Sequence, residues 1–139
     1  MAPRVLLVDD EANILRMLGA LLKSEGYSVE QASSGDAALR AVERREPDVV
    51  LLDLLMPPPG PDGLAVLAKL HTRANDLPVI MMSGKAGLQD AIQATRLGAF
   101  QFLEKPLSPE SVLATLQAAL QLRRTRAENK ALRRALEKL

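Results

Sequence analysis

Five side chains that could do chemistry together are spread over most of the chain: Asp9, Asp10, Asp53, Ser83 and Lys105. They stand at or just after the ends of four short, largely apolar runs: VLLV, VVLL, PVIMM and FQFLE. In a parallel α/β sheet, the carboxyl ends of neighbouring strands meet in one crevice, where ligands bind. Carboxylates, a hydroxyl and an ammonium group in one crevice predict a site for a divalent cation, a phosphoryl group and its acceptor.

The carboxylates of this set suit a magnesium ion. Mg²⁺ prefers oxygen ligands, keeps several waters, and needs only one or two carboxylates from the protein. Asp10 and Asp53 can supply those carboxylates, and Asp9 can hold one of the waters. The backbone carbonyl of Leu55 can complete the protein ligands. Taken alone, the acids at the start also suit the first turn of a helix, and Asp53 could be a buried structural carboxylate.

Asp53 is the predicted phosphoryl acceptor. A carboxylate can attack phosphorus to form an aspartyl-phosphate, and phosphoryl transfer depends mainly on positioning and charge neutralisation. Asp53 follows the most apolar run and would lie deepest, with Mg²⁺ and Lys105 supplying the neutralising charge. Lys105 precedes Pro106, which favours extended backbone at the lysine. Separately, Lys105 could be a solvated charge and Ser83 an ordinary turn serine, so the prediction depends on the whole set.

Strand-like and helix-like segments alternate five times along the chain. This pattern predicts an α/β fold in which a doubly wound parallel sheet of five strands carries helices on both faces. The last helix begins with Ser108 as N-cap and Pro109 at its first position. Because no glycine or further proline follows, it is predicted to continue far beyond the sheet. The predicted strands are residues 4–8, 27–31, 48–52, 78–82 and 100–103.

Composition excludes several classes of protein. The 139 residues are 47% hydrophobic, which suffices for one domain with a real core. The net charge of +1 gives no sign of the basic face that nucleic-acid binding requires. The absence of cysteine excludes disulfides and thiolate metal sites. Because neither a signal peptide nor a membrane-length apolar run is present, we expect a cytoplasmic protein.

Four segments occur together in a specific order: VLLVDDE at 5–11, LLDLLMP at 51–57, MMSG at 81–84 and GAFQFLEKPL at 98–107. Over about residues 4–122 the chain resembles the receiver domain of two-component response regulators. The resemblance implies a flavodoxin-like sheet of order 2-1-3-4-5, Mg²⁺ as cofactor and a sensor histidine kinase as phosphoryl donor. It implies no enzyme in the ordinary sense, but a protein that catalyses phosphoryl transfer to, and dephosphorylation of, its own aspartate.

The resemblance also implies a role for each site residue: Asp9 and Asp10 as the acidic Mg²⁺ pair, Asp53 as phosphoacceptor, Ser83 as switch hydroxyl, Phe102 as rotating aromatic and Lys105 as phosphate contact. After phosphorylation, Ser83 would move to donate a hydrogen bond to the phosphoryl group. That movement would pull the loop after the fourth strand and leave room for Phe102 to turn inward. The fourth helix and fifth strand would then present a different surface.

One segment departs from the family pattern. The family usually reads Met-Pro-x-x-Asp-Gly after the phosphoacceptor, whereas Met56 to Gly63 is two residues longer and contains four prolines. This loop is predicted to lie over the site and to be stiff. We expect it to affect dephosphorylation or partner choice rather than phosphorylation itself.

Residues 123–139 are predicted to form a coiled-coil-like linker helix after a receiver domain of residues 1–122. A heptad assignment gives these positions, alternating a and d: Leu122, Thr125, Asn129, Leu132, Leu136 and Leu139. A single Asn at an a position favours two parallel strands, and Glu128 at g can pair with Arg133 at e of the partner. The segment predicts a homodimer; the alternative is a solvated, charged helix.

The receiver and linker together resemble those of NtrC-like sigma-54-dependent transcriptional activators, which implies an ATPase and DNA-binding output domain beyond Leu139. A stand-alone receiver that docks on another protein is the alternative. A Mg²⁺-dependent phosphatase with an aspartyl nucleophile is disfavoured, because Leu55 stands where such enzymes need a second acid. A nucleotide-binding flavodoxin-like protein is disfavoured, because no glycine-rich loop follows the first strand.

Overall fold

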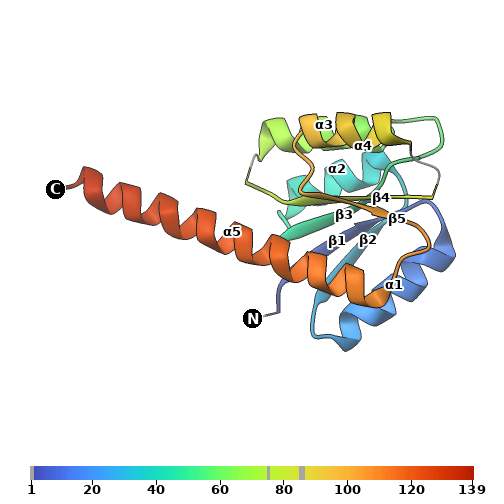
Figure 1. Cartoon of the computed structure of the whole chain (residues 1–139), viewed down its shortest axis with the longest axis horizontal. Coiled ribbons are helices and arrows are strands. Elements are labelled where there is room, and N and C mark those ends of the chain that lie inside the picture. Colours follow the sequence, from blue (N-terminus) through green and yellow to red (C-terminus); the bar gives the residue numbers. More distant parts are fainter. Residues whose placement is uncertain (1, 75, 85–86) are drawn as a thin grey trace.

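Five parallel strands form one sheet in the order β2-β1-β3-β4-β5, which confirms the predicted fold. The computed structural model describes residues 2–74, 76–84 and 87–139 (Figure 1). β1 and β3 lie side by side at the centre of the sheet, so their carboxyl ends are neighbours. The strands are β1 (Arg4–Val8), β2 (Ser28–Ala32), β3 (Val49–Asp53), β4 (Val79–Ser83) and β5 (Gln101–Glu104).

Helices cover both faces of the sheet, with α1 and α5 on one side and α2, α3 and α4 on the other (Figure 1). The alternation of side chains along each strand creates two cores. On β3, Val49 and Leu51 face the first pair of helices, whereas Val50 and Leu52 face the other three. The helices are α1 (Ala12–Ser24), α2 (Gly35–Arg44), α3 (Gly63–Arg73), α4 (Leu88–Arg96) and α5 (Pro109–Glu137).

Four of the five strands begin and end about one residue later than predicted. β3 includes Asp53, which pairs with Met82, and β4 includes Ser83, which pairs with Glu104. The prediction ended each strand with its apolar run, because apolar residues report burial of side chains. Backbone pairing continues for one more residue, so both polar groups are held by the ladder of the sheet rather than by a loop.

The helix boundaries follow local capping chemistry. The side chains of Ser34, Asp62 and Ser108 each accept a hydrogen bond from a backbone N–H in the first turn of the helix they precede. Gly26 (φ +92°) and Gly98 (φ +100°) follow the ends of α1 and α4 in the left-handed conformation that glycine allows.

α5 continues well beyond the sheet and projects from the body (Figure 1). Leu116 and Leu120 are buried, Leu122 and Arg123 are half-buried, and residues 124–139 are exposed. We refer to residues 123–139 as the α5 tail. Within the described residues, no helix is both long enough and apolar enough to cross a membrane.

Candidate functional site

Three aspartates meet at the carboxyl end of the two central strands. Asp9 follows β1 directly and is fully buried, and Asp53 ends β3 with 4% of its surface exposed. Asp10 is exposed beside them, and carboxylate oxygens of the three residues lie within 4.8 Å of one another. The backbone N–H of Glu11 donates to Asp9 Oδ1 at 2.9 Å, which fixes that carboxylate. We refer to Asp9, Asp10 and Asp53 as the acid cluster.

The ammonium group of Lys105 reaches this cluster from the loop after β5. Its Nζ lies 2.8 Å from Asp9 Oδ2 and 3.7 Å from Asp53 Oδ1. The peptide bond between Lys105 and Pro106 is cis. Burial lowers the pKa of Lys105, but the hydrogen bond to Asp9 and the nearby negative charges outweigh that effect and leave the pKa raised. Lys105 is therefore a permanent cation whose closest partner is Asp9.

The carboxyl group of Asp53 is an unusually weak acid, with its pKa raised from 3.8 to about 7. Burial is the largest cause and the negative charge of Asp9 is the second, while a hydrogen bond with Asp10 adds to them. The charge of Lys105 and a backbone N–H from Leu55 lower the pKa, but only in part. The charge of Lys105 thus offsets only part of the effect that burial and the neighbouring carboxylates have on Asp53.

The acid cluster fits a magnesium ion on two observations. Its donors are all carboxylate oxygens, close enough together to share one small ion. Burial and the charge of Asp9 raise the pKa of Asp53 and so disfavour its ionised form, which a divalent cation would favour. The Leu55 side chain is 56% exposed beside the site, and the role of its carbonyl as a ligand stays a prediction.

Ser83 and Phe102 lie on adjacent strands, as the switch hypothesis requires. Ser83 is 1% exposed at the end of β4, and its carbonyl accepts a hydrogen bond from the backbone N–H of Lys105 at 2.8 Å. Phe102 is on β5, where it pairs with Met81 of β4. It is half-buried against the core beneath α2, α3 and α4. The loop that Ser83 would pull includes Lys85 and Ala86, which lie outside the described residues.

The long proline-containing loop closes tightly behind Asp53. The backbone N–H of Gly63 donates to the carbonyl of Leu54 at 3.0 Å. A methyl group on Gly63 would lie 2.2 Å from the carbonyl oxygen of Asp53, so only glycine fits where the loop returns. At Pro61 the loop contacts the first turn of α2, where a Cβ on Gly35 would meet the Pro61 carbonyl at 2.4 Å. The additional residues therefore pack on α2.

Glu11 was missed as a member of the site. Its carboxylate lies 3.5 Å from Lys105 Nζ, at the exposed side of the buried pair with Asp9. The signal was present in the sequence, since Glu11 is the third acid of the Asp-Asp-Glu triplet. Sequence alone suggested for Glu11 only a place at the start of a helix.

We refer to the predicted a and d positions from Leu122 to Leu139 as the dimer stripe. Most of its side chains are exposed rather than packed on the body of their own chain. Leu132, Leu136 and Leu139 are 59%, 57% and 100% exposed, and Asn129 is exposed as well. Leu122 is different, because it is half-buried and lines a shallow hollow with body residues. The stripe that a partner could cover therefore begins after Leu122.

Over most of its length the chain is similar to known regulatory proteins. The chain matches the response regulator receiver domain family over residues 5–117. It is 34% identical over 128 residues to the nitrogen assimilation regulatory protein NtrX of Azorhizobium caulinodans, covering 92% of this chain and 28% of that protein. It is 36% identical over 133 residues to the regulatory protein AtoC of Escherichia coli, covering 96% of this chain and 28% of that protein.

Solved structures of related proteins show the same fold. A crystal structure of NtrX from Brucella abortus in complex with ATP superposes with a TM-score of 0.89 at 34% identity, covering 95% of this chain and 30% of that one. A CheY-like receiver domain protein from Methanospirillum hungatei gives a TM-score of 0.86 at 28% identity, covering 91% of this chain and 99% of that one. The chain spans less than a third of the length of the curated relatives NtrX and AtoC. It belongs to the response regulator receiver domain family.

Proposed function

We propose that this chain is a phosphorylation switch in which Asp53 accepts a phosphoryl group from a phosphohistidine of a sensor histidine kinase. The observation that carries the proposal is the close approach of Asp9, Asp10, Asp53 and Lys105 at the carboxyl edge of the sheet. This arrangement provides a nucleophile, a place for a cation and a fixed positive charge. Those are the parts that phosphoryl transfer needs most.

In the transfer, an Asp53 carboxylate oxygen attacks phosphorus. A P–O bond forms while the P–N bond to the donor histidine breaks, and the imidazole keeps the electron pair and takes up a proton. A bound Mg²⁺, held by Asp10, Asp53 and the Leu55 carbonyl, with Asp9 holding one of its waters, would neutralise negative charge on the phosphoryl oxygens. Lys105 contributes a second positive charge, 3.7 Å from the attacking carboxylate. In dephosphorylation, water attacks phosphorus and the Asp53 carboxylate leaves.

Ser83 and Phe102 connect this chemistry to a surface. The Ser83 hydroxyl donates to a phosphoryl oxygen, and the backbone after β4 moves with it. Phe102, on the adjacent strand, then turns toward the space that this movement leaves. The support for this step is the placement of both residues, one buried at the site and one half-buried beside it.

The phosphoacceptor is tested by intact mass after incubation with acetyl phosphate and Mg²⁺. We expect the wild-type chain to gain one phosphoryl group and Asp53→Asn to gain none. Asp36→Asn is the matched control, because Asp36 is an exposed carboxylate in the first turn of α2. No mass gain in folded wild-type protein, or an equal gain in Asp53→Asn, would exclude Asp53 as the acceptor.

We further propose that the α5 tail carries the phosphorylation state to an output domain in transcription regulation and dimerises through its leucines. The support is that NtrX and AtoC are regulatory proteins whose alignments with this chain extend beyond residue 117. The exposed leucines of the tail add to it. Sedimentation of the wild type and of Leu132→Glu, with and without acetyl phosphate, tests this dimer. A wild type that is monomeric in both states would contradict it.

A further inference from the structure

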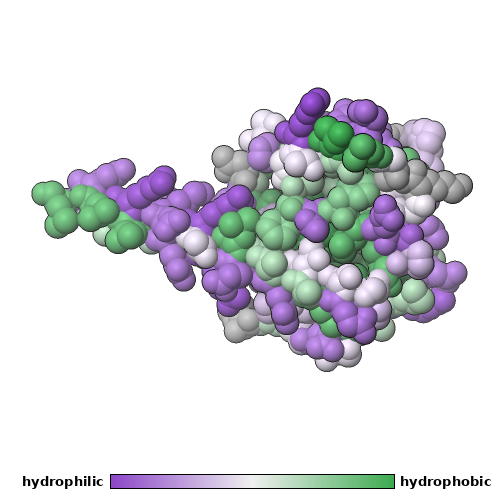
Figure 2. All heavy atoms as spheres, in the orientation of Figure 1, coloured by the Kyte–Doolittle hydropathy of each residue, from purple (hydrophilic) through white to green (hydrophobic). Residues whose placement is uncertain are grey.

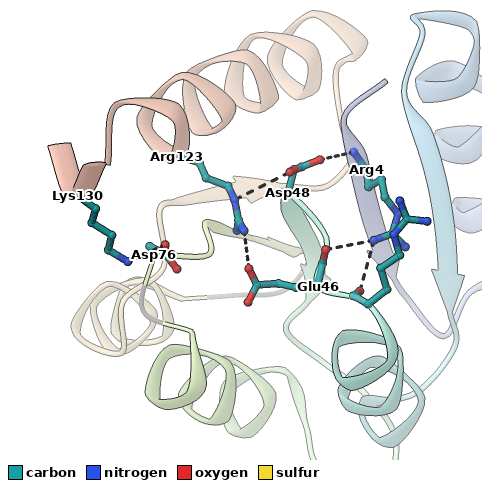
Figure 3. A network of polar contacts seen from close by, with 7 residues as sticks. Arg4, Glu46, Asp48, Asp76, Arg123 and Lys130 are labelled. Atoms are coloured by element: carbon teal, nitrogen blue, oxygen red, sulfur yellow. Dashed lines mark hydrogen bonds and ion pairs between the residues drawn. The ribbon is translucent and has the colours of Figure 1, made fainter. Parts of the chain in front are cut away.

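Two cationic side chains of α5 form ion pairs with acids on the body of the same chain. These acids lie at the amino ends of the strands, opposite the acid cluster. Arg123 forms an ion pair with Glu46, and its Nε lies 4.0 Å from Asp48 Oδ1 (Figure 3). Further along the helix, Lys130 Nζ lies 3.0 Å from Asp76 Oδ2. Glu46 and Asp48 precede β3, and Asp76 precedes β4. Beyond its buried leucines, α5 is therefore attached at two further points, to two different loops.

The two acids that receive Arg123 are in a segment that is itself held in place by Arg4. The backbone N–H of Arg4, at the start of β1, donates to Asp48 Oδ2 at 2.7 Å. The Arg4 guanidinium donates to the carbonyl of Glu46 at 3.2 Å (Figure 3). At the second point, the hydrogen bond from Lys130 lowers the pKa of Asp76, as expected for a carboxylate with a close cationic partner. The first point thus connects the tail to the starts of β1 and β3, and the second connects it to the loop before β4.

The two cations share one face of the helix, because residues a heptad apart differ by only about 20° in direction. The leucines of the tail lie on the other face. At about 100° per residue, Leu132, Leu136 and Leu139 are rotated by about 180° to 240° from Lys130. In Figure 2, apolar side chains gather toward the free end of the tail. Attachment through Arg123 and Lys130 thus directs the leucines away from the body.

We propose that Arg123 and Lys130 form a two-point anchor that sets the rotation of the α5 tail, so that its leucine stripe faces a second copy of the chain. A second copy is the partner we infer for the leucines, because of the dimer proposed above and because Glu128 and Arg133 beside the stripe have complementary charges. With one ion pair, the tail could still tilt and rotate about that contact. Two ion pairs about 10 Å apart along the helix, on separate loops, restrict both tilt and rotation.

The anchor is tested by distances within one chain. Because the chain contains no cysteine, spin labels can be placed at Lys69→Cys on α3 and Arg134→Cys in the tail, both exposed positions. Pulsed EPR of labelled protein diluted in excess unlabelled protein reports only the intramolecular distance. We expect one narrow distribution in the parent, and a broader, shifted one in Lys130→Glu and in Asp76→Lys.

The swapped pair, with Asp76→Lys and Lys130→Glu together, is expected to recover the narrow distribution. Arg124→Glu is the matched control, because Arg124 is exposed on the same helix and makes no ion pair with the residues that the structure describes. Exposed ion pairs contribute little to stability, so each variant should remain folded. Narrow distributions in both single variants, or a swapped pair that stays broad, would overturn the anchor.

A second readout tests which face meets the partner. We expect a disulfide between copies when Leu136→Cys is oxidised, and none for Arg134→Cys, which lies closer to the anchored side. Equal cross-linking at both positions would overturn the proposed orientation. If neither position cross-links while the EPR distances behave as expected, the proposed dimer fails and the anchor stands.

Discussion

Asp53→Asn is expected to stabilise the folded chain at neutral pH when no divalent cation is present. The pKa of Asp53 is about 7 in the folded protein against 3.8 for the unperturbed group. The unfolded chain therefore loses this proton more easily, and ionisation of Asp53 favours unfolding. The penalty is absent below the lower pKa, grows as pH rises through the interval, and is complete above the higher one. Asparagine removes it.

The size of the effect follows from the two pKa values. Each tenfold difference in proton affinity corresponds to about 1.4 kcal/mol. Linkage then gives a penalty of about 4 kcal/mol at pH 8 and about 2 kcal/mol at pH 5. Asp53→Asn should therefore raise the free energy of unfolding by about 2 kcal/mol more at pH 8 than at pH 5.

Urea unfolding in EDTA at the two pH values measures this difference. Asp36→Asn is the control, since an exposed carboxylate in the first turn of a helix contributes at most about 1 kcal/mol at either pH. Saturating Mg²⁺ should stabilise the wild type and leave Asp53→Asn nearly unchanged, because a ligand stabilises only the state that binds it. If the stabilisation by Asp53→Asn is the same at pH 5 and pH 8, the account of its raised pKa is wrong.

Three further substitutions test separate parts of the structure. Lys105→Gln removes the positive charge beside Asp53 and is expected to slow phosphorylation by acetyl phosphate on the order of a hundredfold. Intact mass against time measures this rate, and an unchanged rate would exclude a role for Lys105 in the transfer. Ser83→Ala should still be phosphorylated but lose any phosphorylation-dependent change in sedimentation, and retention of that change would refute the switch. Gly63→Ala places a methyl group 2.2 Å from a backbone oxygen and should cost about 2 kcal/mol or more in urea unfolding; a neutral result would mean that the loop after Asp53 moves freely.

The local features of the fold could be predicted because each depends on a few neighbouring residues. Ser108 is predicted as a helix N-cap, and it accepts the expected backbone hydrogen bond, as Ser34 does at α2. Gly26 and Gly98 follow helix ends, and both have the positive φ that glycine allows. The chemistry of these positions acts over one helical turn, so the linear sequence contains all of it.

The residues of the candidate site could be predicted, but not which carboxylate pairs with Lys105. Asp9, Asp53 and Ser83 follow apolar runs, and parallel strands bring their carboxyl ends to one edge of the sheet. The partner of Lys105 was not evident, because it depends on where the loop after β5 places the ammonium. The structure places it 2.8 Å from Asp9 and 3.7 Å from Asp53. Burial and the charge of Asp9 keep the pKa of Asp53 raised, because Lys105 lowers it only in part.

The order of strands and helices, the residues at the carboxyl edge and the leucine spacing of the tail can all be predicted from the sequence, since they are periodic or local patterns. How the tail attaches to the body depends instead on the packed structure. The ion pairs of Arg123 with Glu46 and of Lys130 with Asp76 join residues 77 and 54 positions apart. No local pattern encodes such contacts, because they exist only when the sheet and α5 have packed in one register.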